Sequence, residues 1–192
     1  MKSLLNKSLF AAAALVLAGT MHVNAAPVHV PVVFSGGHDT DPRDRGRPVI
    51  LVASALGVPP KVFRDAFTHV HPAPAGMRPT EQEAQDNKAA LLEALSPYGV
   101  TNDRLDTVSN YYRYVRSQGQ HWPATPAAAY ALVEHGVITG YVVTSGGSGY
   151  SSAPGVTVPG ITGRAVAVLS FSKSFSANGA VSSIVVVQNK SK

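Results

Sequence analysis

Residues 136–143 read Gly-Val-Ile-Thr-Gly-Tyr-Val-Val, and residues 179–186 repeat that pattern without a gap as Gly-Ala-Val-Ser-Ser-Ile-Val-Val. Each copy begins at a turn signal, His135-Gly136 in the first and Asn178-Gly179 in the second. Asn-Gly is typical of hairpins because both residues tolerate a positive φ. The repeat therefore predicts two antiparallel hairpins, which pair residues 128–134 with 137–144 and residues 165–171 with 180–187.

Upstream of about residue 120 the apolar residues recur with a helical period instead. The pattern predicts helices over 48–56 and 60–69, each with Pro in its first turn. Thr80 and Glu83 form a capping box for a helix that runs to about residue 95. We expect five of its residues to face inward: Ala84, Ala90, Leu91, Ala94 and Leu95. A last helix begins at Thr101 or Asn102.

The two patterns together predict an α+β fold, in which a small helical N-terminal unit is followed by an antiparallel β-hairpin unit. We place the helical unit at residues 40–118 and the β unit at residues 124–189. Residues 26–39 form an extended N-terminal segment before them.

Residues 1–25 have the three parts of a cleavable secretory signal peptide. Lys2 and Lys7 give a positive start, residues 9–19 are apolar but too short to span a membrane, and residues 23–25 offer a cleavage site. We therefore expect a periplasmic or secreted protein. No later segment is apolar enough to span, so no transmembrane span is expected in the mature chain.

Charge and cysteine content exclude several classes of function. The first 25 residues hold two of the 16 basic side chains and none of the 11 acidic ones, so 14 positive and 11 negative charges, a net of +3, remain. No basic run indicates nucleic-acid binding. The chain has no cysteine, which excludes disulfides, a thiol nucleophile and a cysteine-based metal site.

Residues 143–158 read Val-Thr-Ser-Gly-Gly-Ser-Gly-Tyr-Ser-Ser-Ala-Pro-Gly-Val-Thr-Val and are followed by the Asn-Gly signal. This part of the chain resembles the Gly-Ser-Gly-Tyr type β repeat of bacterial surface proteins and phage tail fibres. The resemblance implies a display or binding scaffold, with a cell-envelope polymer or another surface protein as its partner, and brings no catalytic residues. The N-terminal half resembles exported bacterial proteins of unassigned activity.

The most chemically suggestive segment holds His38, Asp39, Asp41 and Asp44 behind two glycines. Carboxylates at alternate positions can converge on a hard cation, and a histidine favours Zn²⁺ or Mn²⁺. His38, Asp39 and Asp41 are therefore candidate ligands for a divalent metal. The alternative is a structural turn in which Asp41 caps the chain and three arginines neutralise the aspartates: Arg43, Arg45 and Arg47.

His69 and His71 lie at the end of a predicted helix, where they can interact with the last carbonyl groups. The alternative interpretation combines them with His38 in a three-histidine metal site.

Four aromatic residues form the densest aromatic cluster of the chain: Tyr111, Tyr112, Tyr114 and Trp122. With Arg113 and Arg116 nearby, they can stack on a sugar ring or a base, which makes them candidate ligand-binding residues. The alternative is a packed joint between the helical and β units.

From these observations we expect a non-enzymatic extracytoplasmic binding or surface-associated module. The alternative is a metal-dependent hydrolase with a site around His38, Asp39 and Asp41. The sequence does not decide whether the protein is an enzyme, and a divalent metal is the cofactor that it suggests.

Overall fold

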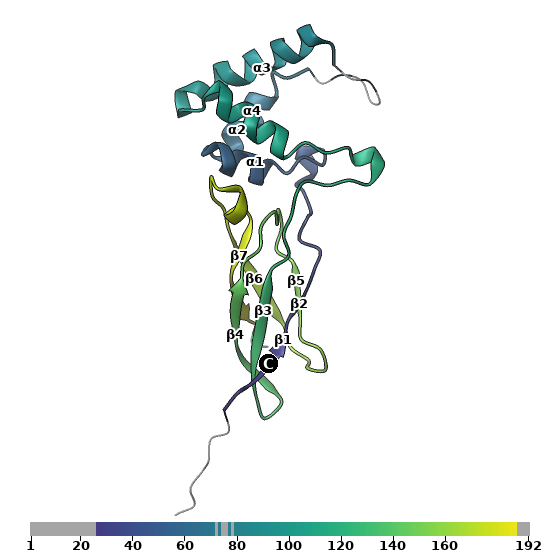
Figure 1. Cartoon of the computed structure of the whole chain (residues 1–192), viewed down its shortest axis with the longest axis vertical. Coiled ribbons are helices and arrows are strands. Elements are labelled where there is room, and N and C mark those ends of the chain that lie inside the picture. Colours follow the sequence, from purple (N-terminus) through teal and green to yellow (C-terminus); the bar gives the residue numbers. More distant parts are fainter. Residues whose placement is uncertain (1–25, 72, 74–76, 78, 188–192) are drawn as a thin grey trace, which may run out of the picture.

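The computed structural model describes residues 26–71, 73, 77 and 79–187, so the predicted signal peptide lies outside the described residues. Figure 1 shows an elongated molecule in which the helices gather at one end and the strands at the other. The predicted α+β fold is confirmed, with helices and antiparallel strands in separate parts of the chain. No helix among the described residues is long and apolar enough to cross a membrane.

The helical unit is built around one short apolar helix, α1. Its residues Val49, Leu51, Ala53, Ala55 and Leu56 are all buried, because other helices and the β unit cover it on several sides. Gly57 ends it in the left-handed conformation, at φ 78°. The α-helices of the described residues are α1 (Val49–Leu56), α2 (Pro60–Phe67), α3 (Glu81–Leu95) and α4 (Asn102–Tyr111), with short 3-10 turns η1 (Pro42–Asp44), η2 (Ser96–Tyr98) and η3 (Arg116–Gln118).

The start of α3 is the predicted capping box. The Thr80 hydroxyl accepts from the backbone N–H of Glu83 at 3.2 Å, and the Glu83 carboxylate accepts from the backbone N–H of Thr80 at 2.7 Å. The prediction that Ala84 faces inward is wrong, because the helix is exposed over residues 81–86. Its first turns extend past the neighbouring helices, and burial becomes complete only at Leu95.

In the part of the chain that the structure describes, the β unit consists of β1 (Val28–Pro31), β2 (Val33–Ser35), β3 (Ala128–Glu134), β4 (Val137–Ser145), β5 (Gly155–Thr157), β6 (Ala165–Ser170) and β7 (Ala180–Val186). They form three small antiparallel sheets of order β1-β3-β4, β2-β5 and β6-β7. Two small apolar clusters lie between them, one around Ala131 and Val158 and the other around Tyr150 and Val181.

The extended segment at residues 26–39 belongs to these sheets. Val28 pairs with Val133 of β3, and Val33 pairs with Thr157 of β5. The strands therefore come from both sides of the helical unit, which is inserted between β2 and β3. Sequence periodicity did not reveal this pairing because more than a hundred residues separate the partners.

The internal repeat has a structural counterpart. Each hairpin contains a β-bulge, which leaves one residue without a partner on the neighbouring strand: Thr139 of β4 in the first and Ser182 of β7 in the second. These two residues occupy the same position in the repeat. The Thr139 hydroxyl donates to the Leu132 carbonyl at 3.2 Å, and the Ser182 hydroxyl donates to the Val168 carbonyl at 3.0 Å. The two hairpins thus share a bulge held by a hydroxyl group.

The turns of the two hairpins differ. His135 and Gly136 both have positive φ, 51° and 78°, as a tight two-residue turn requires. Asn178 instead has an extended backbone at φ −85°, and residues 171–179 form a longer loop with a 3-10 turn, η4 (Phe175–Ala177). Asn178-Gly179 therefore does not make the tight turn that its sequence favours, because the side chain of Asn178 is held by hydrogen bonds to the helical unit.

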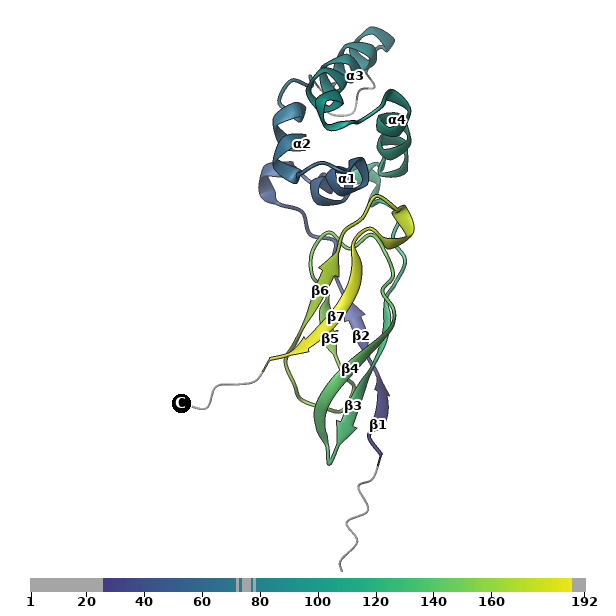
Figure 2. The same ribbon diagram turned by 90° about the vertical axis from the view of Figure 1, so that its left-hand side faces the viewer.

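These hydrogen bonds join the two units. Figure 2 shows the loop between β6 and β7 reaching the helices below α1 and α4. The buried Asn178 amide donates to the Leu51 carbonyl at 2.7 Å and to the Tyr112 hydroxyl at 2.8 Å. The Phe175 ring stacks on Tyr111 with centroids 3.9 Å apart.

Candidate functional site: an arginine-lined cavity

The turn η1 begins as the sequence predicted. The Asp41 carboxylate accepts from the backbone N–H of Arg43 at 2.9 Å and forms an ion pair with the Arg43 guanidinium at 2.5 Å. Hydrogen bonds from Arg43 hold the pKa of Asp41 well below its usual range. Asp41 is therefore a capping residue whose charge is already balanced.

Asp44 takes a partner that the sequence did not indicate. Its carboxylate is 4% exposed and accepts from Arg64 of α2, from Nε at 2.6 Å and from Nη2 at 2.9 Å. These hydrogen bonds raise the pKa of Arg64. The two-pronged ion pair fixes η1 against α2.

Arg45 and Arg47 were expected to neutralise the aspartates, and this expectation is wrong. Across the part of the chain that the structure describes, no ion pair joins either of them to a carboxylate. Arg45 has a left-handed backbone, at φ 50°. Arg47 donates from Nη1 to the Asp44 carbonyl at 3.3 Å, and its guanidinium lies 3.9 Å from the centroid of the Phe67 ring.

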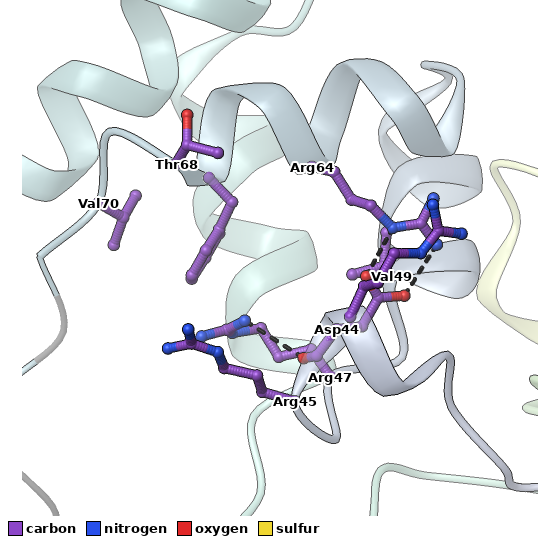
Figure 3. A pocket seen from close by; sticks show the side chains of 9 residues that line it. Asp44, Arg45, Arg47, Val49, Arg64, Thr68 and Val70 are labelled. Carbon is purple, nitrogen blue, oxygen red and sulfur yellow. Dashed lines mark hydrogen bonds and ion pairs between the residues drawn. The ribbon is translucent and has the colours of Figure 1, made fainter.

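The two guanidinium groups lie close enough to influence each other. Figure 3 shows the side chains of Arg45 and Arg47 extending the same way, whereas Arg64 turns toward Asp44. Burial lowers the pKa of Arg47, the positive charge of Arg45 lowers it further, and the negative charge of Asp44 raises it. The site thus holds two neighbouring cations that form no ion pair with a carboxylate among the described residues.

These side chains line a cavity of about 390 Å³ between η1, α1 and the end of α2. A volume of this size lies in the range of small-molecule sites. The cavity combines a cationic wall with an apolar one, and its lining consists of Arg43, Asp44, Arg45, Arg47, Val49, Arg64, Phe67, Thr68 and Val70. A cavity with these two walls can bind a ligand that carries an anionic group on an apolar substituent.

The three predicted metal ligands point to different partners. The backbone N–H and carboxylate of Asp39 bond the Ser152 hydroxyl, and Asp41 caps η1. His38 packs against the rings of His121 and Tyr150, with centroids 5.1 and 5.5 Å away. Within the described ranges, no group of three or more His, Asp or Glu side chains is arranged to hold a metal ion. His38, Asp39 and Asp41 are therefore not brought together as a set of metal ligands.

His69 and His71 follow α2. The backbone N–H and carbonyl of His71 bond the side-chain amide of Asn87, at 2.7 and 2.8 Å, which fastens this segment to α3. His38 instead lies among His121, Trp122 and Tyr150. The structure thus gives His38 a different set of neighbours from the one that a three-histidine site requires.

The aromatic cluster lies at the joint between the two units. Tyr112 is buried against Asn178, and burial raises its pKa to about 12. Trp122 is buried and donates from Nε1 to the Gly149 carbonyl at 2.8 Å, while Tyr111 stacks on Phe175. Tyr114 donates to the Gly46 carbonyl. These contacts are those of a packed joint, although Tyr114 and Trp122 also line a smaller hollow of about 170 Å³.

Arg64 and Phe67 line the arginine-lined cavity, although the sequence analysis gave them no role in a site. Both lie on α2, three residues apart and hence on one helical face. The sequence signal for these two residues was an amphipathic helix with an arginine next to its apolar face.

Comparisons with protein-family models, with curated proteins and with solved structures found no match.

Proposed function

We propose that this protein is a non-enzymatic extracytoplasmic binding module whose arginine-lined cavity holds an anionic group of a cell-envelope polymer or of another surface protein. One observation carries the proposal. Arg45 and Arg47 line a cavity side by side and have no carboxylate partner among the described residues.

The charges around the cavity support an anionic ligand. Four arginines line it. Arg43 is paired with Asp41 and Arg64 with Asp44, whereas Arg45 and Arg47 form no ion pair among the described residues. Bringing two like charges together costs free energy, which a bound anion recovers. Guanidinium groups also present their N–H donors in a planar fork that matches carboxylate and phosphate oxygens.

The cavity is held in shape before any ligand arrives. Arg47 is fixed by the Asp44 carbonyl on one side and by the Phe67 ring on another. The Asp44–Arg64 ion pair fixes η1 itself. Because Arg47 and η1 are already fixed, binding there costs less side-chain entropy than binding to a mobile surface arginine.

The test compares two double variants of equal charge. R45A/R47A removes the unpaired guanidinium groups, and R113A/R164A removes two exposed ones elsewhere. Binding to a phosphate-bearing polyol polymer, a polyuronate and a neutral glucan is measured by isothermal titration calorimetry at physiological salt. We expect wild type and R113A/R164A to bind an anionic polymer alike and to ignore the glucan. We expect R45A/R47A to bind at least about tenfold more weakly.

Equal losses in the two double variants would show that net charge, and not the cavity, attracts the polymer. Absence of binding to either anionic polymer would contradict the proposal itself.

A further inference from the structure

We infer that the anion is a phosphomonoester in its dianionic form, with its phosphate on Arg45 and Arg47 and its ester substituent against Phe67 and Val70. The inference rests on the proposed function and names the chemical class of its ligand. Three properties of the cavity carry it: the size of the charge excess, the number of free donors and the apolar wall.

The charge excess matches a dianion. Two positive charges remain after the pairs Asp41–Arg43 and Asp44–Arg64 are formed. A phosphomonoester carries about −1.5 to −2 at neutral pH. A carboxylate, a sulfate ester or a phosphodiester carries one negative charge and leaves one guanidinium uncompensated.

The free donors match three oxygens better than two. Arg47 uses one N–H on the Asp44 carbonyl, and its guanidinium keeps further donors. No hydrogen bond from the Arg45 side chain occurs within the described part of the chain. One guanidinium fork satisfies the two oxygens of a carboxylate, whereas the three terminal oxygens of a phosphomonoester can accept from both forks at once.

The apolar wall accounts for the remaining space. The cavity of about 390 Å³ has room for much more than a phosphate group, since a water molecule takes about 30 Å³. Val49, Phe67 and Val70 line it beside the arginines. The substituent on the ester oxygen can lie there and bury apolar surface, which adds affinity that inorganic phosphate does not gain.

The backbone of Arg45 is consistent with a built site. Arg45 and His135 are the residues other than glycine with positive φ in the described ranges. His135 lies in a tight hairpin turn, but Arg45 ends η1, where its N–H donates to the Pro42 carbonyl at 3.2 Å. Such a conformation is unfavourable for a residue that has a Cβ, and it is often retained at ligand sites.

The test uses four small probes on the full mature chain: phenyl phosphate, phenyl sulfate, methyl phosphate and benzoate. Phenyl sulfate has nearly the shape of phenyl phosphate with one charge fewer. At about pH 7.5 we expect phenyl phosphate to bind about tenfold more tightly than phenyl sulfate or benzoate. We expect it to bind at least about threefold more tightly than methyl phosphate, with that factor reduced in the near-isosteric variant V70T.

Acidification gives a second readout, because the phosphate loses its second charge near pH 6. The advantage of phenyl phosphate over phenyl sulfate should shrink to about twofold or less at about pH 5. The charged groups that line the site are Arg43, Arg45, Arg47, Arg64 and Asp44. Asp41 pairs with the lining residue Arg43, and His69 stands in the sequence between the lining residues Thr68 and Val70. A change in the protein's own charge would alter phenyl sulfate binding as well, so the sulfate is the control.

Two further probes distinguish the sources of a phosphomonoester. Phosphatidylcholine vesicles that contain phosphatidic acid present it on a lipid, and glucose 6-phosphate presents it on a soluble sugar. Binding of either that is lost in R45A/R47A supports the inference, and binding of neither overturns it. Equal, pH-independent affinity for phenyl phosphate, phenyl sulfate and benzoate overturns it while leaving the anion-binding function intact. If none of the small anions binds and R45A/R47A behaves as wild type toward the polymers, the proposed function fails too.

Discussion

Replacing Asn178 by alanine should remove hydrogen bonds that join the helical unit to the β unit and so lower the free energy of unfolding. The side chain is fully buried between them and makes three hydrogen bonds. Its amide nitrogen donates to the Leu51 carbonyl and the Tyr112 hydroxyl, and its oxygen accepts from the backbone N–H of Ser172 at 3.2 Å. One residue of the β unit therefore anchors α1, the end of α4 and its own loop.

The magnitude follows from the groups left behind. Each lost hydrogen bond costs about 1 kcal/mol, and the small cavity left by the side chain adds to this. The Tyr112 side chain is buried, so water does not readily replace the lost partner. We expect N178A to lower the free energy of unfolding by about 3 to 4 kcal/mol.

Urea denaturation followed by far-UV circular dichroism measures this loss. S176A is the matched control, because Ser176 is exposed in the same loop and should change stability by less than about 0.5 kcal/mol. A double-mutant cycle with Y112F isolates the contact between Asn178 and Tyr112, for which we expect a coupling of about 1 kcal/mol. A loss below about 1 kcal/mol in N178A, with no coupling, would refute the role of this residue in the joint.

Two other predictions concern a glycine and a histidine. A Cβ on Gly147, at φ 61°, would lie 2.3 Å from the Thr125 carbonyl oxygen, so G147A should destabilise the fold by at least about 2 kcal/mol in the same assay. G136A, where nothing lies within 4 Å, should cost only about 1 kcal/mol, and equal losses would contradict the steric argument. Burial lowers the pKa of His38 below its ordinary value of 6.5. His38 therefore binds a proton more readily in the unfolded chain than in the folded one. For this reason the free energy of unfolding should fall as pH drops from about 7.5 to 5.5. H38F should flatten that dependence, and an unchanged slope would show that His38 does not contribute to it.

The elements that the sequence predicted best are those fixed by neighbouring residues. The capping box of Thr80 and Glu83 and the hairpin turn at His135-Gly136 each need only a few consecutive residues. Periodicity then sets the lengths of α3 and of the strands beside the turn. The conformation of such elements is determined by interactions between neighbouring residues, and contacts with the rest of the fold favour the same conformation.

The features that the sequence did not predict depend on partners far along the chain. The pairing of β1 with β3 joins Val28 to Val133, and no local signal specifies which strand an extended N-terminal segment will join. Asn178 shows the same effect in a turn. Asn-Gly favours a tight hairpin by itself, but the hydrogen bonds to Leu51 and Tyr112 hold Asn178 in an extended conformation instead.

The arginine-lined cavity exists because one ion pair forms at long range. Residues 39–47 hold three aspartates and three arginines, so a count of charges there predicts mutual neutralisation. Arg64 is 20 residues from Asp44, yet α2 places its guanidinium on that buried carboxylate. Arg43 takes Asp41, and Asp39 turns to Ser152. All three carboxylates thus have other partners, so Arg45 and Arg47 form no ion pair within this segment. Their positive charges line the cavity instead.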